Sequence, residues 1–469
     1  MANPLSKTIS ELAADLDARR LSASDLVEAA IARHQKWDGT LKAYSLWAPE
    51  EARRTAHGAD AAFAAGARSG PLQGIPVSVK DLFGVTGWPT FAGSPRRLPA
   101  AWEQDGPLVA SVRRQLGVMM GKTHMVEFAF GGTGVNNHYG CPRNPWDEKA
   151  PRSPGGSSSG AGVSLCEGSA LLAFGSDTAG SVRIPASATG NVGLKVTAGR
   201  WSTDGVVPLS RVFDTPGILI RSVADAVYCF AALDPAQGDA RAFERAAAAC
   251  DIGSVRIGLG DPTMWEDCAP GIAEAAKEAL DALARAGARV RPKTMAEIKD
   301  AVAVFNEGGV SGPELRAFLD LELPGWIPLI DKINNKIVQA VATLPTSVYL
   351  QRQYRLAALA RSATTRFDDV DVIACPTLVI SPPTLDEISD SESHWAANRK
   401  LVRNTVPGNY LGLCSITMPV GRDRAGMPVG LQFTARGGNE ERLLAVAWAA
   451  ERVLGRPAER IGAPPLFKE

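Results

Sequence analysis

Residues 74–81, Gly-Ile-Pro-Val-Ser-Val-Lys-Asp, alternate apolar and polar side chains and end in a lysine and an aspartate. This alternation has the two-residue period of a β-strand and predicts a short strand over residues 75–79. Helical and extended patterns then alternate: we predict a helix over residues 108–116, a strand over 118–120 and a helix over 160–167. Strands separated by helices are typical of an α/β protein, with helices on the faces of a sheet.

The same alternation extends towards both ends of the chain. The first sixty or so residues are predicted to be helical, and Thr8 and Glu11 fit a capping box at the start of one helix. Further strands are predicted at 255–259, from 290 onward, and at 369–374, 416–420 and 429–433, and further helices at 272–286, over most of 293–365 and at 440–454.

No linker, low-complexity tail or internal repeat divides the chain. We therefore expect one domain over residues 1–469. Its predicted parts are a helical segment at about 1–65, a core at about 70–230, a variable insertion at about 260–365 and the remainder of the sheet at about 366–469.

The composition argues against nucleic-acid and membrane partners. Lys plus Arg number 50 and Asp plus Glu number 50, so no basic surplus favours nucleic-acid binding. The first residues become polar at once, and no run of 18 apolar residues predicts a membrane span. The 7 cysteines are dispersed without a C-x-x-C pair, which indicates reduced thiols and a cytoplasmic location.

Two more stretches carry unusual patterns. Residues 153–160, SPGGSSSG, form a Gly/Ser loop that opens an apolar helix, and residues 175–185, GSDTAGSVRIP, surround Ser181 with small residues. Singly, each has an ordinary explanation, because Gly/Ser stretches are often linkers, serines beside glycine often lie in turns, and a lysine such as Lys80 is usually solvated. An eight-residue loop that opens a helix does not join two domains, so we treat the three stretches as one candidate site.

Three familiar motifs are incomplete, wrongly placed or absent. Residues 117–123, GVMMGKT, are one residue short of a phosphate-binding loop. Residues 156–160 satisfy G-x-S-x-G, but that motif needs a preceding strand, and the proline-flanked residues 151–154 are a poor one. His394 is the only histidine after His138, and neither H-E-x-x-H nor a Cys/His cluster predicts a zinc site.

In this order and at these spacings, the three stretches resemble the amidase signature family. The likeness covers about residues 70–230 and 370–450, and it includes the pieces GKTHMVEFAFGG (121–132), HYGCPRNPWD (138–147), SVADA (222–226) and MPVGLQF (427–433). The resemblance implies the α/β amidase signature fold, a central, mixed, twisted sheet covered by helices on both faces.

The resemblance also implies a Ser-cis-Ser-Lys triad. Ser181 would attack the amide carbonyl, and Ser157, at a cis peptide bond, would pass the proton between Ser181 and the base Lys80. The implied oxyanion hole consists of the backbone N–H groups of Thr178, Ala179, Gly180 and Ser181. The implied supporting residues are Asp177, Arg183 and Ser158.

The base must be neutral to accept a proton. An unperturbed lysine has a pKa of about 10.4, so about one in 2,500 is neutral at pH 7. Lowering that pKa to about 7 takes roughly 4.6 kcal/mol of differential desolvation, which burial in a dry site supplies. We therefore expect Lys80 to be buried.

The resemblance predicts hydrolysis of the C–N bond of a small to medium carboxamide through an acyl-enzyme, without cofactor or metal. Two alternatives are the glutaminase (A-type) subunit of a glutamine-dependent amidotransferase, and a carbamate or ester hydrolase using the same site. The expected partner is a small amide, with no nucleic acid and no membrane; a homodimer stays open. Phe128, Ala129, Phe130 and Gly131 are the expected pocket wall. The insertion is expected to face the substrate, with Trp265, Trp326 and Tyr349 as candidates.

Overall fold

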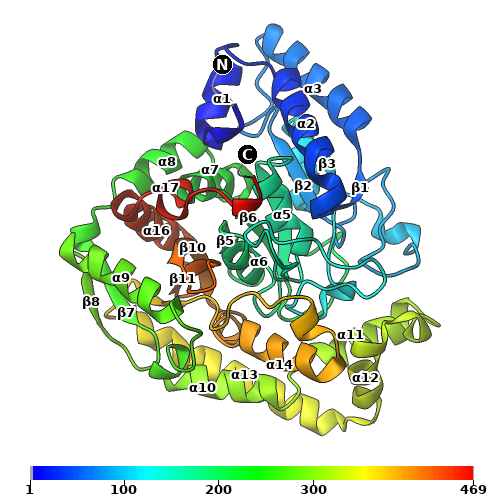
Figure 1. Ribbon diagram of the computed structural model, residues 1–469, viewed down its shortest axis with the longest axis vertical. Coiled ribbons are helices and arrows are strands. Elements are labelled where there is room, and N and C mark those ends of the chain that lie inside the picture. The colour runs from blue at the N-terminus through cyan, green and yellow to red at the C-terminus, as the bar shows by residue number, and fades with distance from the viewer. Residues whose placement is uncertain (1–3, 468–469) are drawn as a thin grey trace.

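The computed structural model describes residues 4–467, in which eleven strands form one sheet (Figure 1). In chain order the strands are β1 (Tyr44–Trp47), β2 (Pro76–Lys80), β3 (Val118–Thr123), β4 (Leu172–Asp177), β5 (Val192–Lys195), β6 (Thr215–Ile220), β7 (Arg256–Leu259), β8 (Arg289–Pro292), β9 (Val372–Pro376), β10 (Cys414–Arg422) and β11 (Pro428–Ala435). They lie in the order β1-β3-β2-β4-β6-β5-β10-β11-β9-β7-β8.

The sheet is mixed, as the resemblance implied. β2 pairs in parallel with β3 and β4, and β7 pairs in parallel with β8 and β9. The remaining neighbours are antiparallel. Because β2 and β4 are parallel neighbours, their carboxyl ends meet at one edge of the sheet.

Seventeen α-helices are found in the described part of the chain. They are α1 (Ile9–Asp17), α2 (Ala23–Leu41), α3 (Pro49–Ala64), α4 (Pro107–Arg114), α5 (Ser159–Glu167), α6 (Arg183–Ala188), α7 (Val223–Leu233), α8 (Ala240–Ala248), α9 (Ile272–Arg285), α10 (Ala296–Asn306), α11 (Ser311–Glu322), α12 (Lys332–Ala340), α13 (Thr346–Thr364), α14 (Ser391–Val402), α15 (Val406–Tyr410), α16 (Glu440–Leu454) and α17 (Pro457–Ile461).

Side chains of the central strands alternate between two apolar layers. On β4, Phe174 packs into the large core that also holds residues of α7 and α16, whereas Ala173 packs into a smaller core with Ala161 of α5 and Ala186 of α6. Since successive side chains of a strand point to opposite faces, α5 and α6 cover one face, and α7 and α16 cover the other. α5 and α6, at the centre of Figure 1, are the helices that follow the two serine-bearing loops.

Small residues let α5 lie very close to its neighbours. A Cβ atom added at Gly160, in the first turn of α5, would lie 2.0 Å from the carbonyl oxygen of Ala43. This separation is far below van der Waals contact, so only glycine fits there. The Gly/Ser loop is therefore held against the chain segment that precedes β1.

Most predicted elements are confirmed, including the capping box of α1, in which Thr8 and Glu11 bond each other's backbone N–H groups. β1 contradicts the prediction of an all-helical start, because this four-residue edge strand is stabilised by antiparallel pairing with β3. β4, β5 and β6 were not predicted. They are short and buried throughout, so no polar alternation marks them. Of the predicted segments, residues 1–3 and 468–469 lie outside the described residues.

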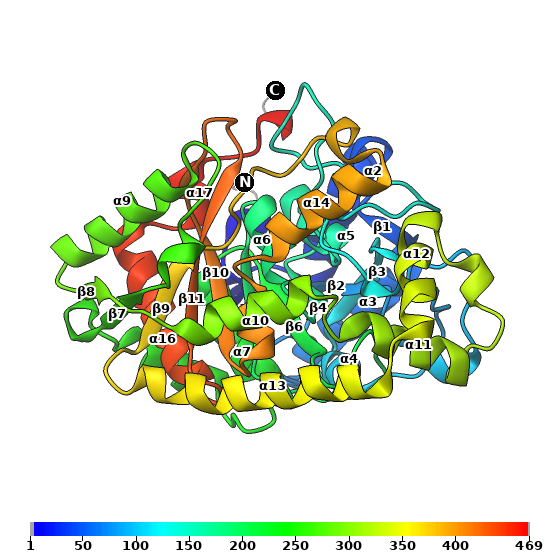
Figure 2. The same ribbon diagram turned by 90° about the horizontal axis from the view of Figure 1, so that it is seen from below.

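The predicted insertion is mostly helical, as expected. α10 packs against α13 and α15, and α11 packs against α12. In Figure 2, α13 runs along the lower edge of the molecule, with α11 and α12 beyond one end of the sheet. Between residues 4 and 467, no helix is both long and apolar enough to cross a membrane.

Phe433, on the central strand β11, tests the contribution of the large core. Its side chain is fully buried, so Phe433→Ala is expected to lower the free energy of unfolding by about 3–5 kcal/mol. Urea unfolding followed by tryptophan fluorescence measures the loss. Phe433→Leu, which keeps most of the apolar volume, is the matched control and is expected to lose clearly less; equal losses would contradict this packing.

Candidate active site

The lysine predicted as base ends β2, beside the end of β4. Lys80 is fully buried, and its Nζ donates to the Oγ of Ser157 at 2.7 Å and to the Oγ of Ser176 at 2.9 Å. Burial lowers the pKa of Lys80 to about 7, against the opposing charges of Asp214 and Asp177. At neutral pH a large fraction of this amine is therefore unprotonated.

The Gly/Ser loop brings Ser157 to this amine. The peptide bond between Gly156 and Ser157 is cis, as the resemblance implied. The N–H of Ser158 donates to the carbonyl oxygen of Ser181 at 3.3 Å, and its hydroxyl donates to the carbonyl of Ser176 at 3.5 Å. Ser158 thus holds the Gly/Ser loop against the segment that carries Ser181.

The loop between β4 and α6 is organised by a buried ion pair. Both Asp177 and Arg183 are fully buried, and two Arg183 nitrogens donate to the Asp177 carboxylate at 3.0 Å each. The same carboxylate accepts the N–H groups of Gly180 at 2.7 Å and Val182 at 3.2 Å. Burial alone would raise the pKa of Asp177, but the charge and hydrogen bonds of Arg183 lower it to about 2. Asp177 is therefore ionised at all ordinary pH values.

Two residues that sequence reasoning missed complete this network. Asn409 of α15 accepts from Arg183 at 2.7 Å and donates to Asp177 at 3.0 Å, and Gln432 of β11 accepts from Arg183 at 2.8 Å. Gln432 lies within the MPVGLQF piece, which is part of the family resemblance, so the sequence could have pointed to this residue. No sequence pattern points to Asn409, because its role depends on the packing of α15 against the loop.

The proposed oxyanion donors divide into two groups. Among residues 4–467, no acceptor is found for the N–H groups of Thr178, Ala179 and Ser181, which remain available to a ligand. Gly180 was expected to be one of the oxyanion donors, but its N–H donates to the Asp177 carboxylate and is not free. Gly180 shapes the loop instead. Its φ of +130° favours glycine, and a Cβ there would lie 2.1 Å from the Thr405 hydroxyl.

Asp214 is a further buried acid at the site that the sequence did not reveal. It accepts the hydroxyl of Thr178 at 2.5 Å and the N–H groups of Leu209 and Ser210 at 2.8 and 3.0 Å. Burial raises the pKa of Asp214 to about 6. Asp214 thereby fixes Thr178 and the segment that brings Leu209 to the cavity described next.

A cavity of about 60 Å³ lies over Ser181. Three of the four residues predicted to form its wall line it, namely Ala129, Phe130 and Gly131. Phe128 does not line it, and this prediction is wrong: its side chain is 1% exposed and packs edge-on against Phe318 and Trp326 in the core. Phe128 and Ala129 have φ values of 47° and 58°, an unusual local backbone that turns consecutive side chains in different directions.

The insertion reaches the cavity through residues other than the predicted aromatics. Phe305 of α10 and Ser311 of α11 line it, whereas Trp326 packs on Phe128. Trp265 lines a separate cavity of about 330 Å³ near the ends of β7 and β8. Tyr349 hydrogen-bonds Glu314, and Glu314 is not among the lining residues.

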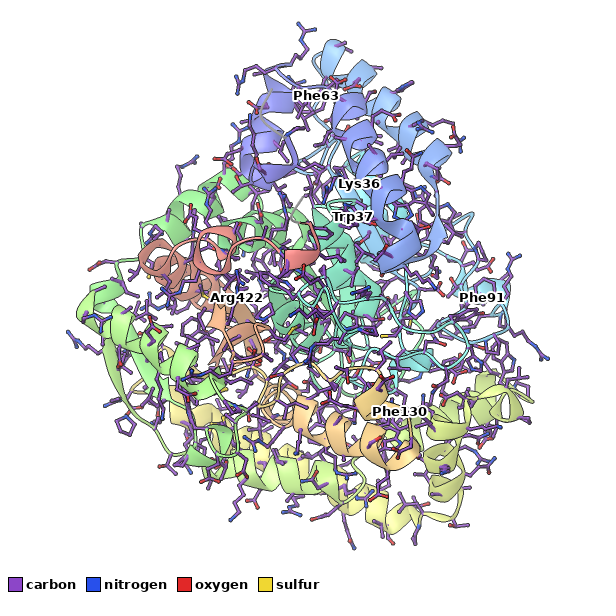
Figure 3. All side chains as sticks on the ribbon, in the orientation of Figure 1. Lys36, Trp37, Phe63, Phe91, Phe130 and Arg422 are labelled. Carbon is purple, nitrogen blue, oxygen red and sulfur yellow. The ribbon has the colours of Figure 1, made fainter. Side chains whose placement is uncertain are left out.

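α14 closes the cavity on another side, through Trp395, Asn398 and Val402. The rings of Phe130 and Trp395 lie 5.9 Å apart between centroids. Phe130, labelled in Figure 3, lies near α14, and its ring tip is close to the position of Gly312 on α11. In residues 4–467, no group of three or more His, Cys, Asp or Glu side chains is arranged to hold a metal ion.

Comparisons with known proteins agree on one family. The family model described as Amidase matches residues 25–444. The 2-amino-5-chloromuconic acid deaminase of Comamonas testosteroni is 45% identical over 460 residues, with 98% of each chain covered. The A subunit of the glutamyl-tRNA(Gln) amidotransferase of Salinispora arenicola is 31% identical over 97% of this chain and 99% of its own.

Solved structures give the same result. A crystal structure of an amidase superposes with a TM-score of 0.85 at 29% identity, covering 96% of this chain and 100% of the other. A 6-aminohexanoate cyclic dimer hydrolase complexed with substrate has a TM-score of 0.85 at 26% identity, over 99% and 100% of the two chains.

Removal of the Asp177 carboxylate tests the loop network. Asp177→Ala leaves the buried Arg183 charge without its partner, so we expect a loss of about 3–5 kcal/mol in unfolding free energy. Asp320→Ala is the control, since it removes the aspartate of the Arg316 pair on an exposed helix surface. Urea unfolding should leave the control near wild type; similar midpoints for both variants would contradict the assigned role of Asp177.

Proposed function

The chain belongs to the amidase family, whose members are hydrolases acting on C–N amide bonds, and we propose that it cleaves a small to medium carboxamide through an acyl-enzyme on Ser181. One observation carries the proposal. A fully buried lysine, with its pKa lowered to about 7, donates to Ser157 at 2.7 Å, and the loop of Ser157 lies against Ser181.

In the proposed reaction, neutral Lys80 takes a proton from Ser157, which takes the proton of Ser181. Ser181 Oγ then attacks the amide carbonyl, and the resulting oxyanion accepts hydrogen bonds from the free N–H groups of Thr178, Ala179 and Ser181. The proton returns through Ser157 to the departing nitrogen. Water then attacks the acyl-enzyme by the same route, releasing a carboxylic acid and regenerating Ser181.

Ser176 supports the orientation of the base. A hydroxyl accepts a hydrogen bond from a charged lysine and donates one to a neutral lysine, so Ser157 and Ser176 accommodate both protonation states of Lys80. Asp177, Arg183 and Ser158 hold the loops without facing the cavity. The small cavity favours a compact acyl group.

A second candidate reaction is favoured by the 45% identical relative. That protein is named for the deamination of 2-amino-5-chloromuconic acid, whereas the 31% identical amidotransferase relative is more distant. An ammonia-release assay that compares 2-aminomuconic acids, simple carboxamides and glutamine separates the candidates. Activity of the purified chain alone on carboxamides supports a stand-alone hydrolase, and activity on glutamine only with partner subunits supports the glutaminase role. Rates with matched esters and carbamates test the remaining alternative.

Covalent labelling tests the nucleophile. A fluorophosphonate is expected to add once to the wild-type chain and not to Ser181→Ala, as measured by intact-mass spectrometry. Lys80→Ala should label about 10²–10⁴-fold more slowly, because the general base is missing. Ser311→Ala is the control, since it removes another hydroxyl that lines the cavity and should still be labelled; an adduct on Ser181→Ala refutes the assignment.

The pH dependence of kcat/KM tests the base. Only neutral Lys80 accepts a proton, so kcat/KM should rise about tenfold per pH unit below its pKa of about 7 and level off above it. Asp214→Asn removes a negative charge that raises the pKa of Lys80, and the inflection should move to lower pH. A flat profile between pH 5.5 and 8.5, or an inflection unmoved in Asp214→Asn, counts against Lys80.

A further inference from the structure

Asn398 of α14 lines the cavity that contains Ser181. Its side chain is buried, with 3% of its surface exposed, and Trp395 and Val402 of the same helix line the cavity with it. Asn398 has no contact with Lys80 or Ser157 that would make it part of the proton path. It is a polar group in the wall of the acyl pocket.

The orientation of the Asn398 carboxamide is fixed by chemistry. Its Oδ1 accepts the N–H of Gly132 at 2.6 Å, and only the oxygen of a carboxamide accepts such a bond. The Nδ2 group must therefore point away from Gly132. Among residues 4–467 it donates to no protein acceptor, so it is available to a ligand in the cavity.

The rest of the cavity wall indicates which acceptor would suit this donor. Phe130, Phe305 and Trp395 supply aromatic surface, and none of the lining side chains found in residues 4–467 is charged. A carboxylate placed there would lose its hydration without gaining a cation, which is costly. A neutral carbonyl oxygen loses less hydration and is satisfied by one N–H donor.

We infer that Asn398 is a specificity-determining residue whose Nδ2 donates to a neutral carbonyl oxygen in the acyl part of the substrate, remote from the scissile amide. The inference rests on the proposed function, because it assumes that the acyl group occupies the cavity over Ser181. The substrate class is then a short carboxamide carrying a second, uncharged carbonyl group. Gly132 fixes the donor in advance, so the hydrogen bond forms without reorganising the side chain.

Three amides with eight non-hydrogen atoms each isolate this interaction. 4-Oxopentanamide has a distal ketone, 4-methylpentanamide replaces that carbonyl oxygen with a methyl group, and succinamate places a carboxylate at the same distance. The wild-type kcat/KM should favour 4-oxopentanamide over 4-methylpentanamide about tenfold, the contribution of one neutral hydrogen bond. Succinamate should be the poorest of the three.

Two variants separate specificity from structure. Asn398→Asp keeps an acceptor for Gly132 but loses the donor, and Asn398→Leu loses both while keeping the branched shape of the side chain. Both variants should reduce the ratio of kcat/KM for 4-oxopentanamide to that for 4-methylpentanamide to about one. A purely structural role would lower both rates together and leave the ratio unchanged, which would overturn the inference.

Other results also refute the inference. Loss of the preference for 4-oxopentanamide in Ser311→Ala, with the preference kept in the Asn398 variants, would assign the recognition to Ser311. If succinamate were the best wild-type substrate, the cavity would recognise a carboxylate and not a neutral carbonyl group. Fluorophosphonate labelling of Ser181 in the same preparations distinguishes the two proposals. Labelling without turnover of 4-oxopentanamide refutes the substrate class, whereas absence of labelling refutes the acyl-enzyme itself.

Discussion

The proposed chemistry depends on the hydrogen-bond partners of one buried amine, the Nζ of Lys80. Lys80, Lys122 and Lys195 are all fully buried, but their partners differ. Lys122 lies 2.8 Å from the Asp81 carboxylate and also donates to one hydroxyl, that of Thr90, whereas Lys195 donates to the carbonyl oxygens of Val196 and Leu413. Lys80 alone of these three donates to two side-chain hydroxyls. Carboxylate and carbonyl oxygens only accept, whereas a hydroxyl both accepts and donates, so Lys80, whose two partners are both hydroxyls, has the environment suited to proton exchange.

The second requirement is a rigid loop around Ser181, and one carboxylate organises it. Asp177 accepts two backbone N–H groups of the loop and pairs with Arg183, which is anchored in turn by Asn409 and Gln432. These contacts join β4 and α6 to α15 and β11, which are distant in sequence. Loss of a partner in this buried network would leave a charged or polar group unsatisfied, which is costly, so these contacts favour one conformation of the loop.

The architecture separates the reacting groups from the groups that surround the substrate. The reacting groups lie at the carboxyl ends of the sheet strands β2 and β4 and just before the helices α5 and α6. The cavity wall comes from residues 129–132, from α10 and α11 of the insertion, and from α14. Changes in these wall segments can therefore alter substrate selection without moving the amine or the serine loops.

The sequence by itself determined the α/β class, the family, and which lysine and serines to examine, because each stretch pairs a local pattern with chemically distinctive residues. It also determined the mixed sheet through the resemblance. It did not determine β4, β5 and β6, whose uniformly buried residues lack a period, nor that Phe128 packs into the core while its neighbours line the cavity. Only the tertiary structure showed the contacts of Asn409 and Gln432 with Arg183 and the contact of Asp214 with Thr178. The same holds for the use of the Gly180 N–H by Asp177 and for the orientation of Asn398. The physical reason is that these features are hydrogen bonds between groups up to about 270 residues apart, and the donor or acceptor left free is decided only when every other partner is in place.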